Sequence, residues 1–168
     1  RMRLWLDIGV ADIAVPEPGW ADYPTLLDMD APHILAYRPA TAIAEKFETM
    51  ISKGLLNSRV KDYHDICMLS RSVPFDGAEL RDSITATFGQ RGTDAPSSRP
   101  GVLSDDYAKR SERMTQWSAF VTRLGVSGIE APDSLVDVVD EINVFIMPPS
   151  TAAAAGQPLS TKWVAGKG

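Results

Sequence analysis

An acid and a lysine stand side by side in Ala42-Ile43-Ala44-Glu45-Lys46, a combination that can handle phosphate. The lysine ammonium is a compact positive charge that suits a phosphate oxygen. The small side chains at positions 42 and 44 permit close packing beside this charged pair. The alternative is a charged helix face in solvent, and the spacing of these residues alone leaves both interpretations open.

A pair of acids lies in the segment Arg59-Val60-Lys61-Asp62-Tyr63-His64-Asp65. Asp62 and Asp65 are three residues apart, so a helix would place them on one face. Two carboxylates in that position could bind Mg²⁺, which takes oxygen ligands and often substrate phosphates. The alternative is that both acids serve the start of a helix, where the helix dipole favours negative charge.

Asp7 is a further candidate, because it follows an apolar stretch and precedes Ile8-Gly9. An Asp near a strand end is a place for a metal-binding carboxylate, and an ordinary turn residue is the alternative. His33 and His64 have no partner at metal-ligand spacing, so we expect structural roles for both. Cys67 is the only cysteine and cannot form an internal disulfide, which favours a reducing, cytoplasmic location.

These side chains need elements that position them, and the pattern predicts an α+β fold that is mainly helical. Strand-like alternation marks residues 2–10 and 33–37, and a Pro-rich loop covers 16–32. The strands look like the remnant of a larger sheet. The expected helices, about five in number, cover residues 39–54, 58–70, 77–88, 105–124 and 132–145.

Capping residues and prolines set the expected ends of these helices. The expected N-caps are Thr41, Asp76 and Ser104, and Pro148-Pro149 should stop the last helix. The chain then divides into the end of a sheet over 1–38, a helical domain over 39–149 and a flexible tail over 150–168.

Charge and hydropathy argue against two broad classes of protein, and a local basic patch stays open. Lys plus Arg number 17 and Asp plus Glu number 22, which gives a net charge of −5. That balance argues against a dedicated polyanion binder, which normally shows a basic face. No apolar run reaches the roughly 18–20 residues of a membrane span.

Four motifs, taken in order, resemble the AbiEii/AbiGii toxin family of nucleotidyltransferases, which belongs to abortive-infection and toxin–antitoxin systems. Leu6-Asp7-Ile8-Gly9 resembles the family's strand that ends in Asp-Ile-Gly. Ala44-Glu45-Lys46 resembles its Ala-Glu-Lys helix, and residues 59–65 resemble its Arg-x-Lys-Asp-x-x-Asp helix. Residues 117–120 resemble its Trp-x-x-Phe. The resemblance spans most of residues 2–150, and the pair of helix motifs at this separation is its most specific part.

The resemblance implies a role for each candidate residue. Lys46 would contact nucleotide phosphate with Arg59 beside it, Asp62 would be an active-site acid, and Asp65 would orient its neighbours in the catalytic group. Asp7 would be a carboxylate of the metal site. Such enzymes bind an NTP with Mg²⁺ and transfer its nucleotidyl group to an acceptor, which in some members is tRNA. An antitoxin protein is the implied partner.

The sequence departs from the family pattern ahead of Asp7. The family's catalytic core begins with a Gly-Ser motif and an Asp-x-Asp strand, neither of which precedes Asp7 here. Asp28-Met29-Asp30 has the letters of Asp-x-Asp, but it follows Asp7 in the Pro-rich loop, so we interpret it as a coincidence. We therefore expect this chain to be the later half of the enzyme and to be inactive by itself. The alternative is a degenerate helical interaction module that binds an antitoxin-like partner or a sister subunit.

Overall fold

The computed structural model describes residues 13–25, 27–126, 132 and 134–165. In this part of the chain, helices dominate and the strands form two small antiparallel pairs, which confirms the mainly helical α+β fold. The strands are β1 (Gly19–Asp22), β2 (His33–Ala36), β3 (Phe75–Asp76) and β4 (Lys162–Trp163). The α-helices are α1 (Pro39–Lys53), α2 (Val60–Ser72), α3 (Gly77–Arg91), α4 (Asp105–Ala108), α5 (Ser111–Val126) and α6 (Leu135–Ala155). Short 3-10 turns cover Gly54–Leu56 and Gly101–Leu103.

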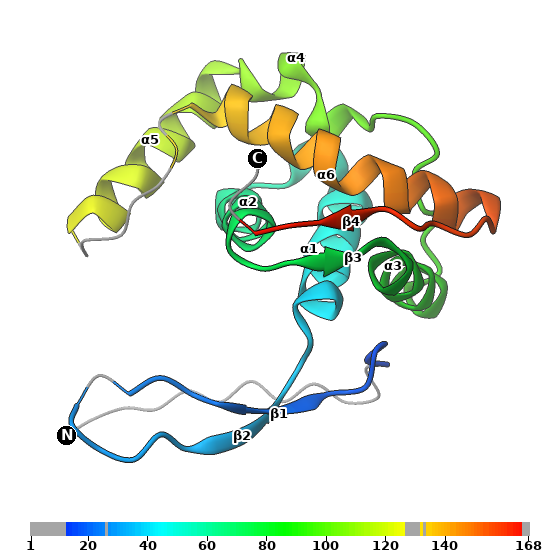
Figure 1. Cartoon of the computed structure of the whole chain (residues 1–168). Helices are drawn as coiled ribbons and strands as arrows, with labels where there is room; N and C mark the ends of the chain where they lie inside the picture. Colours follow the sequence, from blue (N-terminus) through cyan, green and yellow to red (C-terminus); the bar gives the residue numbers. More distant parts are fainter. Residues whose placement is uncertain (1–12, 26, 127–131, 133, 166–168) are drawn as a thin grey trace.

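One hydrophobic core joins α1, α2, α3 and α6, and α1 runs through the middle of this helical body (Figure 1). Apolar residues recur at helical spacing on each of these helices, so each buries one stripe. The fully buried side chains include Ile43, Phe47, Tyr63, Ile66, Leu80, Ile84, Ile142 and Ile146. None of the described helices is long and apolar enough to cross a membrane.

The ends of α1 follow simple backbone rules. Pro39 is its first residue, a position where proline costs nothing because that N–H has no partner within the helix. Gly54 ends the helix at φ 54°, in a region that favours glycine. The expectation that Thr41 is the N-cap is wrong, because Arg38 occupies that position. The Thr41 hydroxyl instead donates to the Val15 carbonyl at 3.0 Å. Asp76 and Ser104 cap α3 and α4 as expected.

Strands β1 and β2 form a hairpin that stands apart from the helical body (Figure 1). The predicted strand at 33–37 is confirmed over His33–Ala36. The prediction of a loop over 16–32 is wrong for Gly19–Asp22, which pairs with β2 from Gly19 opposite Ala36 to Asp22 opposite His33. Cross-strand pairing outweighs the low strand propensity of a Gly- and Pro-rich segment. The expected strand over residues 2–10 lies outside the described residues.

Two of the expected helices have different bounds. The helix expected over 105–124 is two helices, α4 and α5, which are separated at Lys109-Arg110. The helix expected to stop at Pro148-Pro149 runs on to Ala155, with both prolines inside it. Each proline removes one helical hydrogen bond, but Pro149 and Ser150 are buried in the continuing helix. Packing therefore outweighs the usual helix-breaking effect.

The chain after α6 returns to the helical body. Strand β4 pairs with β3 in antiparallel register, with Trp163 opposite Phe75. The Trp163 ring lies 5.3 Å from the Phe145 ring, centre to centre, at 73°. This edge-on contact is a favoured geometry for two aromatic rings, so Trp163 secures the last described segment against α6.

Candidate functional site

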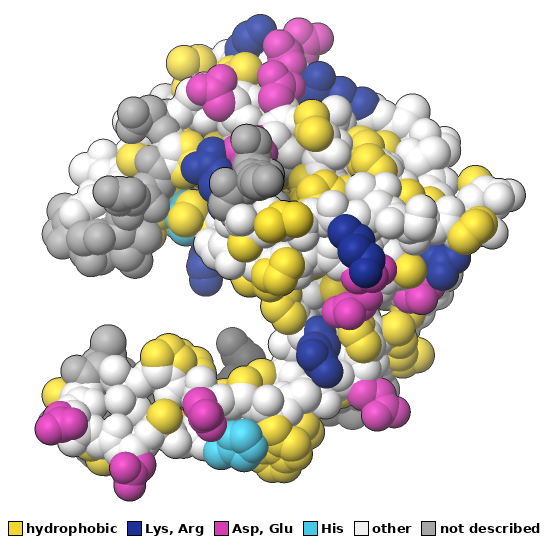
Figure 2. Space-filling model, in the orientation of Figure 1, with side chains coloured by type: hydrophobic (Ala, Val, Ile, Leu, Met, Phe, Trp, Pro, Cys, Tyr) yellow, Lys and Arg dark blue, Asp and Glu magenta, His cyan; other side chains and the backbone are white. Residues whose placement is uncertain are grey.

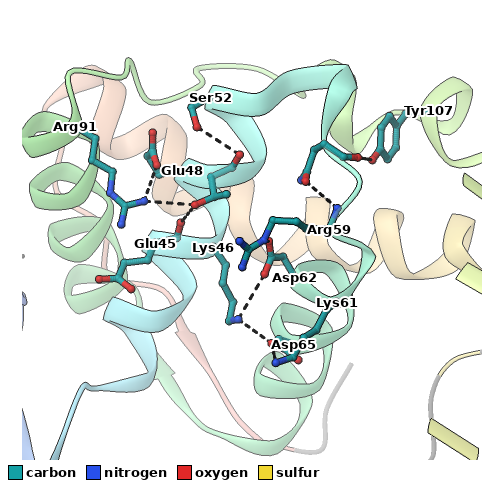
Figure 3. Close-up of polar contacts among 12 residues, drawn as sticks. Glu45, Lys46, Glu48, Ser52, Arg59, Lys61, Asp62, Asp65, Arg91 and Tyr107 are labelled. Carbon is teal, nitrogen blue, oxygen red and sulfur yellow. Dashed lines mark hydrogen bonds and ion pairs between the residues drawn. The ribbon is translucent and has the colours of Figure 1, made fainter. Parts of the chain in front are cut away.

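Lys46 from α1 meets two acids of α2 at one point, as Figure 3 shows. Its Nζ donates to Asp65 Oδ2 at 2.7 Å and lies 3.6 Å from Asp62 Oδ1. Asp62 and Asp65 share one face of α2 because they are three residues apart. The structure thus brings together the three residues that the sequence predicts as the catalytic group.

Asp62 is the more buried of the two acids. Its side chain is 1% exposed, and its Oδ2 accepts a hydrogen bond from Arg59 Nε at 2.8 Å. Its other oxygen, Oδ1, is buried and has no hydrogen-bond partner among the described residues. A buried charge is costly unless it is paired, so Arg59 and Lys46 together keep this carboxylate at the wall of the site.

Asp65 lies among three nitrogen-bearing side chains. Lys46 contacts Oδ2 at 2.7 Å, Lys61 lies 4.0 Å from the same oxygen, and His64 Nδ1 lies 3.3 Å from Oδ1. Burial raises the pKa of Asp65, but the hydrogen bonds and charges of Lys46, His64 and Lys61 outweigh burial and lower it. Asp65 is therefore held as an anion that fixes the Lys46 ammonium.

A pocket of about 420 Å³ lies beside this cluster. Its walls come from α1, α3 and the start of α2, and the lining residues are Ala42, Glu45, Lys46, Thr49, Arg59, Asp62 and Arg91. Of the two small side chains expected to permit close packing, Ala42 is part of the wall and Ala44 is fully buried. Three cations face the pocket against two carboxylates. A hollow with that charge distribution suits an anionic ligand with polar groups of its own.

Sequence reasoning missed Arg91 and Thr49 as lining residues. Arg91 is in the last turn of α3, where a basic residue is ordinarily explained by the helix dipole. Its side chain nevertheless donates to Glu48 Oε2 at 2.7 Å and to Thr49 Oγ1 at 3.4 Å. Only the packing of α3 against α1 shows that Arg91 belongs to the pocket.

The described residues of this site fit a phosphate ligand better than a bound metal ion. Lysine and arginine side chains are the usual partners of phosphate oxygens, and three of them line the pocket. No group of three or more His, Cys, Asp or Glu side chains within the described ranges could hold a metal ion. These residues therefore fit a phosphate ligand but do not by themselves form a metal centre.

Among the described residues, His33, His64 and Cys67 do not line this pocket. Asp7, the predicted metal carboxylate, lies outside the described residues. His33 pairs with Asp22 at 2.7 Å on the exposed hairpin, and His64 is buried with its ring edge-on to Phe120. Cys67 is fully buried in the core, and burial raises its pKa to about 12. The structural roles expected for both histidines and the cysteine stay predictions.

Comparison with known proteins identifies the family. The family described as nucleotidyl transferase AbiEii toxin, type IV toxin–antitoxin system, matches residues 1–139. No curated protein and no solved structure matches this chain. The matched range includes the Lys46 helix and the Asp62 helix that form the pocket. This chain therefore belongs to the AbiEii family of nucleotidyl transferase toxins.

Proposed function

We propose that this chain carries the phosphate-handling part of a toxin-type nucleotidyltransferase, which moves a nucleotidyl group from Mg-NTP to an acceptor such as tRNA. One observation carries the proposal: Lys46 from α1 meets Asp62 and Asp65 from α2, and Lys46 and Asp62 line a pocket that two arginines also line. The family match supports the class of reaction. Its type IV toxin–antitoxin description implies an antitoxin protein as partner.

Nucleotidyl transfer makes one bond and breaks one bond at phosphorus. The oxygen of an acceptor hydroxyl loses its proton to solvent and bonds to the α-phosphorus. The bond from that phosphorus to the bridging oxygen of the β-phosphate breaks, and pyrophosphate leaves with the electron pair of this bond. Negative charge grows on the leaving group, so a nearby cation stabilises the transition state. Lys46 is the proposed cation, and Asp65 orients it through the 2.7 Å contact.

Asp62 and Arg59 have a linked role in this proposal. Arg59 fixes Asp62 through Nε and Oδ2, which leaves Oδ1 at the pocket wall without a hydrogen-bond partner in the described part of the chain. That oxygen lies 3.6 Å from Lys46 Nζ and helps to hold the ammonium at the pocket wall. Asp7 stays a proposed metal carboxylate, and Mg²⁺ enters as part of the NTP substrate.

The test is to measure the binding of Mg-NTP by calorimetry, with each of the four common NTPs. Lys46→Ala should weaken binding by about tenfold or more, because a hydrogen bond to a charged group is worth about 1.5–3 kcal/mol. Lys53→Ala is the matched control, since Lys53 ends the same helix and is exposed. Equal affinity in the wild type and Lys46→Ala would overturn the proposal.

We also propose that this chain alone does not complete the transfer. The support is the sequence, in which no Gly-Ser and Asp-x-Asp pair precedes Asp7. The chain should bind Mg-NTP yet transfer no labelled nucleotide to a tRNA mixture above the protein-free blank. Incorporation of label by the chain alone would contradict this part of the proposal.

An interaction module is the second candidate, and the hairpin favours it. Trp20 is 66% exposed and Leu35 is 56% exposed, and Figure 2 shows hydrophobic side chains across this arm. Exposed apolar patches often mark protein contacts. Sedimentation equilibrium tests the sister-subunit version of this candidate. A self-association that Trp20→Ser and Leu35→Ser abolish supports it, and a concentration-independent monomer mass contradicts it.

A further inference from the structure

Glu48 is a buried acid that faces away from the Lys46 cluster and toward α3. Its side chain is 5% exposed. Oε2 accepts from Arg91 Nη1 at 2.7 Å, and Oε1 accepts from Thr93 Oγ1 at 2.7 Å. A carboxylate buried without partners would be costly, and here each oxygen has one. The consequence is that the Arg91 guanidinium is held at the rim of the pocket.

The pocket therefore collects cations from three separate segments. Lys46 comes from α1, Arg59 from the residue ahead of α2, and Arg91 from the end of α3. In the view of Figure 3, Arg91 lies to the left of Lys46 and Arg59 to its right. Each cation contacts an acid that fixes its position: Asp65 for Lys46, Asp62 for Arg59 and Glu48 for Arg91.

A guanidinium carries five N–H donors, so an arginine that pairs with one acid can still donate to a ligand. Three cations around one hollow therefore suit a ligand that offers several anionic oxygens. A single phosphate is much smaller than this pocket of about 420 Å³ and offers few oxygens for three cations. A chain of linked phosphates offers many oxygens, and the planar guanidinium binds two of them side by side.

We propose that Arg91, positioned by Glu48 and Thr93, is a phosphate-binding residue, and that the pocket takes a polyphosphate rather than a lone phosphate. This inference deepens the proposed function and rests on it, since it assigns the polyphosphate tail of the nucleotide to the space between Lys46 and Arg91. The competing explanation is that Arg91 only neutralises Glu48. The two explanations differ in what an arginine-to-lysine change does to ligand binding.

The experiment is calorimetry on the full chain with orthophosphate, inorganic tripolyphosphate, ATP and AMP. Arg91→Gln should weaken tripolyphosphate and ATP binding by about tenfold, with little change for AMP or orthophosphate. Arg91→Lys keeps the charge opposite Glu48 and should keep the fold, yet it should still lose affinity for tripolyphosphate because the planar fork is gone. Arg71→Gln is the matched control, because Arg71 pairs with Glu141 through two hydrogen bonds and does not line this pocket.

The outcomes separate this inference from the proposed function. Wild-type tripolyphosphate affinity in both Arg91 variants, together with lost ATP affinity in Lys46→Ala, overturns the inference and leaves the proposed function standing. Unchanged ATP affinity in the Lys46 and Arg91 variants overturns both. Orthophosphate that binds the wild type as tightly as tripolyphosphate also overturns the inference. Weaker ATP binding without weaker tripolyphosphate binding would place the contact on the nucleoside and contradict it.

Discussion

Asp62 and Asp65 are neighbours on one helix, yet their surroundings assign them different tasks. Asp62 is 1% exposed and is bonded by Arg59, whereas Asp65 is 22% exposed and contacts Lys46 directly. A carboxylate that is partly exposed and ion-paired can exchange partners when a ligand arrives, because solvent lowers the cost of the change. A carboxylate fixed in the interior keeps its place. We therefore propose that Asp65 positions the Lys46 ammonium in the free protein and gives up part of this contact to a bound phosphate.

The lowered pKa of Asp65 makes the stability of the fold depend on pH. Because the folded-state pKa is lower than the unfolded one, the Asp65 anion stabilises the fold fully above the ordinary Asp range. This contribution is lost as the pH falls through the lowered folded pKa. Asp65→Asn should therefore lower the free energy of unfolding most near pH 7. The difference in this free energy between the wild type and the variant should shrink toward pH 3. Urea unfolding across this range measures it.

A second background tests the cause of this pH dependence. In a Lys46→Met chain, Asp65→Asn should show a much weaker dependence on pH, because the ion pair that lowers the pKa is gone. A difference between wild type and Asp65→Asn that stays constant from pH 7 to pH 3 would contradict the prediction. An equal pH dependence of the Asp65→Asn effect in the wild-type and Lys46→Met chains would also contradict the prediction.

Only part of the site could be predicted at this scale. The spacing of Asp62 and Asp65 fixes their common helix face, and the motif resemblance points to Lys46 as their partner. Arg91 could not be predicted, since it is 43 residues from Glu48 in the chain and nothing local distinguishes it from a helix-end cation. Its role depends on tertiary packing of α3 against α1, which residue spacing does not encode.

Within the element α3, two glycines sit in opposite environments. A Cβ at Gly77 would lie 2.6 Å from the Thr161 carbonyl oxygen, whereas a Cβ at Gly89 would meet nothing within 4 Å. Gly77→Ala should push β4 away and cost about 1–3 kcal/mol. Gly89→Ala should stabilise the helix by roughly 0.5–1 kcal/mol, because glycine loses more backbone entropy on folding. Chemical denaturation of both variants checks the pair, and a stabilised Gly77→Ala would show that Thr161 does not approach α3.

The helix ends illustrate which element boundaries local rules can predict. Asp76 and Ser104 cap helices because their side chains accept from the backbone of the first turn, a contact that lies within a few residues. Pro148 and Pro149 break the same kind of rule, since α6 continues through them. Pro149 is buried by tertiary packing. A rule for proline that uses only neighbouring residues does not include this packing.

At the scale of the whole molecule, the helical body and the hairpin differ in how they are held. The buried residues of the hydrophobic core begin at Ala40, so none of the described hairpin residues belongs to it. Among the described residues, hydrogen bonds join the segment ahead of the hairpin to the body. Val15 accepts from Thr41 and Ser83 through its carbonyl, and the Ile13 N–H donates to Gln90. Since hydrophobic burial is the dominant favourable term in folding, the body should depend little on the hairpin.

A shortened chain of residues 38–168 should therefore still fold. Its circular dichroism should keep the helical signal, and urea should unfold it in one cooperative transition close to that of the full chain. A chain of residues 1–157 is the matched control. It removes Trp163, which packs on Phe145, so it should unfold at distinctly lower urea even though it loses fewer residues.

If the chain of residues 38–168 has no cooperative transition, the helical body is not independent, and the hairpin must supply packing that its exposed side chains do not show. If instead both shortened chains unfold like the full chain, β4 adds nothing, and the core is complete with α1 to α6.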